Sequence, residues 1–301
     1  MADGDYERPD VRARELGRMQ AELRRLADER NVAKLAALES LYAAYVDTFR
    51  LPSGESGAEL PPMMALKLFH TRKVVEAAKA IASGEKFDAR TAFVTAAAAL
   101  LHDTGRYEQL RRWNTFRDSD SVDHAVFSHD IVAERGWLAE CGFSKEDSDA
   151  VLFAVLVHNR RDIPPEPDPV KLAAAKAVRD ADKLDIFRVL EDQVAKTDWR
   201  NDCKAFWNLP TTRPPNPEVV RAIRERRPVE YQHISSLADF VLIQVGWMVS
   251  GLEYATSRRI CRDRGYLAFR RRFLAELSDD PACGEICDLA AKALGSPGEG
   301  V

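Results

Sequence analysis

The chain has 301 residues, 46% of them hydrophobic, which is enough for one large domain or two ordinary ones with a substantial core. Its net charge is -4 with both signs interspersed, a balance that gives no support for a nucleic-acid-binding or membrane protein. Five cysteines at wide spacing predict reduced thiols rather than a disulfide framework. The first residues lack the basic start and apolar stretch of a secretory signal, so we expect a cytoplasmic protein.

Residues 1–50 are predicted to form an N-terminal amphipathic extension of one or two helices, because apolar side chains recur there at helical spacing. We interpret this apolar stripe as packing within the chain or as a contact in a homodimer. Residues 51–62 are rich in proline, glycine and serine and are the predicted linker. The stripe consists of Leu16, Met19, Leu23, Leu26, Leu35, Leu38 and Leu41.

Residues 63–212 are predicted to form the main domain, and residues 213–301 a C-terminal helical extension packed on it. No run shows the sustained alternation of a strand, so we expect an all-α protein. The most apolar segment, 237–252, is too short and too polar for a membrane span and is interpreted as a buried helix. The expected helices cover 63–82, 88–101, 121–139, 145–157 and 169–194 in the main domain, and 218–226, 234–264, 267–277 and 285–294 in the extension.

Four histidines and two aspartates lie inside apolar, helix-like segments, where an unpaired polar side chain would be costly. This pattern predicts a buried metal site. A second His-Asp pair, His129-Asp130, lacks the apolar run and the following glycine, and its histidine is interpreted as a surface or supporting residue. Five residues place His124 and His129 about 140° apart on a helix, so only one of them can face the metal, and we choose His124. The predicted ligands are His70, His102, Asp103, His124, His158 and Asp182.

Imidazole and carboxylate together suit a divalent transition metal such as Mn, Fe, Co, Ni or Zn, whereas Mg and Ca prefer oxygen alone. Cysteine is absent from these segments, which disfavours a structural zinc site. Neighbours on a helix point about 100° apart, so His102 and Asp103 converge only near an irregular helix end or at neighbouring ions. Gly105 is expected to supply such an end. A carboxylate has two oxygens, which makes Asp103 the natural bridge between two ions.

The ordered series resembles the HD-domain superfamily of metal-dependent phosphohydrolases over about residues 63–189. The segments 102–106, 123–125 and 180–185 look most like a bacterial branch of this group. The resemblance implies an HD-domain helical bundle in which His70, His102, Asp103 and Asp182 form the basic metal site. His124 and His158 would complete a binuclear version, so two ions are expected. In such a site a hydroxide generated between the ions attacks phosphorus.

The resemblance also limits the substrate. The segment after His158 contains no second histidine and no Gly-Tyr-Pro, which disfavours a cyclic dinucleotide. Asp103 is not followed by the Glu-Asp pair of guanosine tetraphosphate hydrolases. A hydrolase of a nucleotide or a related small phosphoester remains. Arg106 and Lys183 are the expected phosphate contacts and act with Asp103 in the reaction, although both could instead pair with acids such as Asp180 and Asp185.

Two other functions stay open from the sequence. Some relatives with the same six ligands resemble di-iron oxygenases that act on a small alcohol or a phosphonate, and the ligands alone do not separate the two chemistries. A non-catalytic nucleotide-binding regulator is the third hypothesis. Nucleic acid is not expected as a partner, because the arginine-rich segment of residues 258–272 is interpreted as a solvated helix face rather than a phosphate-binding track.

Overall fold

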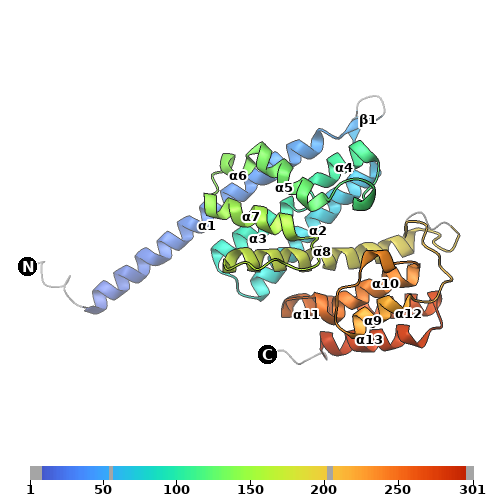
Figure 1. Cartoon of the computed structure of the whole chain (residues 1–301). Coiled ribbons are helices and arrows are strands. Elements are labelled where there is room, and N and C mark those ends of the chain that lie inside the picture. Colours follow the sequence, from blue (N-terminus) through green and yellow to red (C-terminus); the bar gives the residue numbers. More distant parts are fainter. Residues whose placement is uncertain (1–8, 54–56, 202–205, 296–301) are drawn as a thin grey trace, which may run out of the picture.

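The computed structural model describes residues 9–53, 57–201 and 206–295, with side chains from residue 28 onward. The chain is all-α, as predicted (Figure 1). Strands in the described part are β1 (Leu51–Ser53) and β2 (Gly57–Glu59), which pair antiparallel with Leu51 opposite Glu59. This small hairpin occupies the predicted linker. No helix among the described residues is long and apolar enough to cross a membrane.

The N-terminal extension is one helix, α1 (Pro9–Asp47), whose first part projects away from the bundle (Figure 1). Leu35, Leu38 and Leu41 lie in or against the core, which explains the second half of the predicted stripe. The first half, Leu16, Met19, Leu23 and Leu26, falls on side chains outside the described ones. The homodimer contact therefore stays a prediction.

The central bundle is built around α3, whose alanines allow its neighbours to approach closely. Ala97, Ala98 and Ala99 are fully buried, and α3 packs against α2, α7 and α8. The Asp88 carboxylate accepts from the Thr91 amide at 2.7 Å and fixes the start of α3, as the sequence indicates. The bundle consists of α2 (Pro62–Gly84), α3 (Ala89–Leu101), α4 (Gly105–Trp113), the 3-10 turn η1 (Asp118–Asp120), α5 (His124–Arg135), α6 (Trp137–Glu140), α7 (Lys145–Val157) and α8 (Pro169–Lys196).

Helix α4 was not predicted, and Gly105 begins it rather than ending a helix. Close packing explains why this residue is a glycine: a Cβ at Gly105 would lie 2.8 Å from the Ser128 amide nitrogen in α5. The Gly105 amide instead donates to Ser128 Oγ at 2.9 Å. Glycine is needed here for the approach of α4 to α5, not for an unusual backbone angle.

The C-terminal extension contains α9 (Pro217–Arg224), the 3-10 turn η3 (Tyr231–His233), α10 (Leu237–Gly246), the π-helical turn η4 (Trp247–Gly251), α11 (Ala255–Asp263), α12 (Tyr266–Leu277) and α13 (Pro281–Leu294). The single helix predicted over 234–264 is wrong, because the chain breaks between η4 and α11. At this break the Glu253 and Tyr254 amides donate to the buried Asp180 carboxylate of α8 at 3.0 Å. Figure 1 shows these helices gathered along α8.

Two further expectations concern the arginine-rich segment and the cysteines. The prediction that the arginine-rich segment is a solvated helix face is wrong at Arg270. This side chain is fully buried between α12, α10 and α8. Among the described cysteines, Cys141, Cys261, Cys283 and Cys287 are free thiols, and Cys203 lies outside the described residues.

Candidate metal centre

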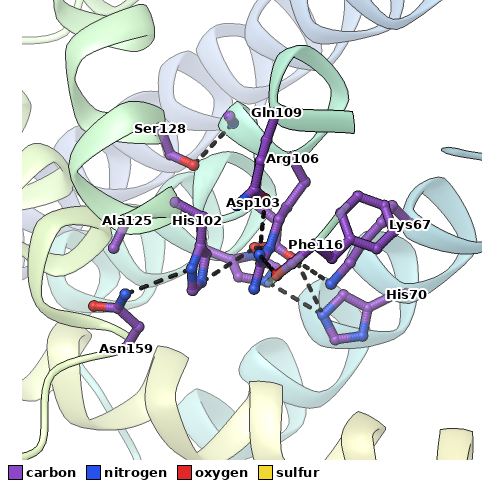
Figure 2. A network of polar contacts seen from close by, with 12 residues as sticks. Lys67, His70, His102, Asp103, Arg106, Gln109, Phe116, Ala125, Ser128 and Asn159 are labelled. Carbon is purple, nitrogen blue, oxygen red and sulfur yellow. Dashed lines mark hydrogen bonds and ion pairs between the residues drawn. The ribbon is translucent and has the colours of Figure 1, made fainter. Parts of the chain in front are cut away.

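The six predicted ligands meet at one place, where the ends of several helices converge. Figure 2 shows His70, His102 and Asp103 at this place. His102 and His158 are the residues at the C-terminal ends of α3 and α7, and His124 is the first residue of α5. His70 lies within α2 and Asp182 within α8. All four histidines and Asp103 are buried, while the Asp182 side chain is 20% exposed.

Asp103 lies between two pairs of histidines and turns one carboxylate oxygen toward each pair. Its Oδ2 atom is 3.6 Å from Nε2 of both His70 and His102. Its Oδ1 atom is 3.7 Å from Nε2 of His124 and 3.9 Å from Nε2 of His158. This carboxylate therefore belongs to both halves of the cluster.

Helix ends orient two of the rings. Nδ1 of His102 donates to the Ala99 carbonyl at 2.8 Å, and Nδ1 of His158 donates to the Val155 carbonyl at 2.7 Å. Carbonyls in the last turn of a helix have no intrahelical donor and are free to accept such a bond. Because a carbonyl only accepts, the proton of each ring lies on Nδ1, and Nε2 presents a lone pair to the cluster.

Carboxylates orient the other two rings. Nδ1 of His70 donates to Asp185 Oδ2 at 2.7 Å, and Nδ1 of His124 donates to Asp118 Oδ2 at 2.5 Å. Burial works to raise the pKa of both carboxyls, but these hydrogen bonds lower it, to about 2 for Asp118. Both acids are thus ionised acceptors, and Nε2 of His70 and of His124 also faces inward. Burial and Lys67 work to lower the pKa of His70, but its hydrogen bonds to Asp182 and Asp185 raise it, so a cation at Nε2 would take the place of a proton.

The arrangement of lone pairs fits a cation. Burial lowers the pKa of His102, and lowers that of His124 and His158 to about 4, so these rings are neutral near pH 7. Nε2 of His124 nevertheless lies 3.0 Å from Nε2 of His158. Two such lone pairs repel each other unless a positive centre lies between them. Two nitrogens that bind one ion at about 2.1 Å and a right angle lie about 3 Å apart.

The donors divide into two groups that share Asp103. The first has two nitrogens from His70 and His102 and carboxylate oxygens from Asp103 and Asp182, whose Oδ1 is 3.1 Å from His70 Nε2. The second has Asp103 with His124 and His158. Three or four donors of mixed nitrogen and oxygen suit a divalent transition metal and leave coordination positions open. Each group could hold a metal ion.

Arg106 lies beside the cluster, and its role as a phosphate contact stays a prediction. Its Nε atom is 3.4 Å from Asp103 Oδ1 and is a buried donor without a hydrogen-bond partner among the described residues. Its Nη1 atom donates to Asp118 Oδ1 at 3.0 Å and to the Phe116 carbonyl at 2.7 Å. Arg106 thus pairs with Asp103 and Asp118, not with Asp180 or Asp185.

Lys183 and His129 point elsewhere. Lys183 Nζ donates to the Gly251 carbonyl of the C-terminal extension at 2.8 Å, because adjacent residues on α8 face about 100° apart and Asp182 faces the cluster. This contact favours a structural role, and the phosphate role of Lys183 stays a prediction. His129 Nδ1 lies 2.9 Å from Asp130 at the surface and makes no described contact with the cluster.

Sequence reasoning missed three residues of the site. Lys67 Nζ donates to Asp103 Oδ2 at 2.8 Å, and its signal was its position one helical turn before His70. Asp185 lies three residues after Asp182, on the same side of α8. Asp118 had no such signal, because it lies in η1, between helices, and reaches His124 only through the fold of the loop.

Comparison with known proteins gives one match. Residues 68–186 match the family model described as the HD domain. No curated protein and no solved structure matches the chain. The matched range runs from just before His70 to just after Asp182 and so encloses all six candidate ligands. Residues 68–186 are therefore similar to the HD domain, and this match, which covers less than half of the chain, agrees with the resemblance expected from the sequence.

Proposed function

We propose that this chain cleaves a phosphoester or phosphoanhydride of a nucleotide or a related small molecule at a site for two divalent transition-metal ions. The observation that carries the proposal is the placement of Asp103, whose Oδ2 faces His70 and His102 while its Oδ1 faces His124 and His158. A carboxylate turned this way suits a bridge between two ions. Mn, Fe, Co, Ni and Zn all fit its nitrogen and oxygen donors.

Two such ions would lower the pKa of a bound water toward neutrality and would offset charge on phosphoryl oxygens. The chain's own residues fix the geometry around that chemistry. Asp185 and Asp118 hold the rings of His70 and His124 by Nδ1, so that four Nε2 atoms converge. Arg106 Nε, which lies 3.4 Å from Asp103 Oδ1 and makes no hydrogen bond among the described residues, could donate to a phosphoryl oxygen.

Charge favours an anionic substrate. Among the six ligands Asp103 and Asp182 carry negative charge, because neighbouring cations and histidines lower the pKa of both carboxyls despite their burial. Burial lowers the pKa of His102, His124 and His158, so these rings are neutral near pH 7, whereas hydrogen bonds to Asp182 and Asp185 raise the pKa of His70, whose extra proton a bound cation would displace. Two divalent ions would exceed this charge, and Lys67 and Arg106 add to the excess. The negative charge of a phosphorylated molecule would offset this excess positive charge, whereas a neutral alcohol would not.

The test is product release from a panel of nucleotides and simple phosphoesters with Mn, with bound metal counted in the same samples. Asp103→Ala is compared with wild type, and Asp130→Ala is the matched control because it removes the acid of the second, surface His-Asp pair. We expect turnover in wild type and in Asp130→Ala. In Asp103→Ala, turnover and bound metal should both be lost.

Other outcomes point to other functions. Oxygen consumption without phosphate release, by protein that carries two irons, would replace the proposal with the oxygenase. Tight nucleotide binding without turnover in any metal would favour a regulator. Wild-type protein that binds no metal and is inert would refute the site itself.

A further inference from the structure

Lys67 contacts the carboxylate that both histidine pairs face. Its Nζ atom donates to Asp103 Oδ2 at 2.8 Å, and the same oxygen is 3.6 Å from Nε2 of His70 and His102. The Lys67 side chain is 19% exposed, so it is partly accessible to solvent at the edge of the cluster. An ammonium has three donors, and one of them is used for Asp103.

A second cation lies at the other oxygen of the same carboxylate. Arg106 Nε is 3.4 Å from Asp103 Oδ1, and Arg106 and Lys67 lie against one aromatic ring, 5.7 Å and 5.4 Å from the centroid of Phe116. Figure 2 shows the three side chains close together beside Asp103. Each carboxylate oxygen therefore has one cation and one histidine pair next to it.

We propose that Lys67 is a positioning residue for Asp103: its ammonium holds the carboxylate at the rotation in which each oxygen faces one histidine pair. The local sequence supports this role, because Lys67 and His70 are three residues apart on α2 and so present both groups to Asp103 from one side. The inference rests on the proposed metal site but not on which substrate is cleaved there.

Charge and orientation predict opposite effects when the ammonium is removed. By charge alone, loss of a cation beside the site tightens the binding of a divalent ion. Loss of a fixed carboxylate weakens it, and groups that orient metal ligands typically change metal affinity about 10- to 100-fold when they are replaced. Weaker binding therefore reports orientation, since charge cannot produce it.

The experiment is a calorimetric titration of metal-free protein with Mn, for wild type, Lys67→Met, Lys67→Arg and Lys73→Met. Lys73 is the matched control because it lies on the same helix and pairs with the surface residue Glu76. We expect affinity to fall about tenfold in Lys67→Met and to be largely restored in Lys67→Arg, which keeps a donor. Lys73→Met should bind like wild type. Thermal unfolding of the metal-free variants checks that each is folded.

Electron paramagnetic resonance of the Mn-loaded proteins gives a second readout that needs no turnover. We expect the spectrum of Lys67→Met to differ from that of wild type and the spectrum of Lys67→Arg to resemble it. Unchanged or tighter Mn binding in Lys67→Met overturns the inference. So does an increase in KM at unchanged metal affinity, which would make Lys67 a direct phosphate contact. A wild type that binds Mn but hydrolyses nothing refutes the proposed reaction, whereas these binding data still decide the role of Lys67.

Discussion

Replacing Arg270 with methionine should destabilise the protein strongly, although Arg270 lies far from the cluster in sequence. Its side chain is fully buried, and burial lowers its pKa to about 10, so the guanidinium is still charged at neutral pH. It donates to Gln244 Oε1 at 2.7 Å, to the Phe187 carbonyl at 2.9 Å and to the Tyr266 carbonyl at 2.9 Å. These bonds join α12 and α10 to α8, the helix that carries Asp182.

The expected loss follows from those contacts. Each of the three acceptors loses a hydrogen bond from a charged donor, although the Phe187 and Tyr266 carbonyls keep their bonds within α8 and α12. This loss costs about 1–2 kcal/mol for each bond, or about 3–6 kcal/mol together. Burial of the methionine side chain offsets roughly 2 kcal/mol of this loss, so Arg270→Met should lower the free energy of unfolding by about 2–4 kcal/mol. Urea denaturation followed by circular dichroism measures this. The control is Arg271→Met, whose exposed side chain pairs with Asp288 and should cost under about 0.5 kcal/mol. Equal stability of the two variants would refute the reasoning.

Two further predictions concern the site and its surroundings. Asp185→Asn removes the charge that holds His70 Nδ1 at 2.7 Å and should weaken Mn binding about 10- to 100-fold. The control is Asp192→Asn, at an exposed acid that also pairs with Arg188, and it should leave Mn binding unchanged. Calorimetric titration compares the two variants, and equal Mn affinities would contradict the role of Asp185. Burial raises the pKa of Tyr42 to about 12 from its usual value near 10. The contribution of Tyr42 to the free energy of unfolding is therefore fully present below pH 10. Above pH 10 this contribution decreases, because Tyr42 ionises in the unfolded chain first, and the loss is roughly 1 kcal/mol at pH 11. Urea unfolding at pH 9 and pH 11 should show a smaller loss in Tyr42→Phe than in wild type, and an equal loss would contradict the account.

The helices of the bundle could be predicted because their signals are local. Asp88 caps α3 as expected, and the predicted span 145–157 matches α7. The ligand types and their order were also visible, since an isolated histidine in an apolar helix is conspicuous. The match to the HD family then confirmed the resemblance over residues 68–186.

The errors share one physical cause, which is that contacts distant in sequence overruled local pattern. Gly105 looks like a helix end, yet it is the first residue of α4, and glycine is required there because a Cβ would lie 2.8 Å from the Ser128 amide nitrogen. The apolar run after residue 237 looks like a continuous helix, yet it breaks so that the Glu253 amide can bond Asp180. Arg270 looks like part of a solvated face, yet acceptors on two other helices surround it.

Helix α8 shows why the acidic segment 179–185 could not be assigned residue by residue. Its successive polar residues face two different neighbours, because each step along a helix turns the side chain by about 100°. Asp182 and Asp185 face His70, while Asp180 and Lys183 bond the backbone of the C-terminal extension at Glu253 and Gly251. The same helix thus holds the metal ligand on one side and is itself held from the other. The C-terminal helices are therefore part of the support of this site, and a change at their contacts with α8 should reach the cluster through the position of Asp182.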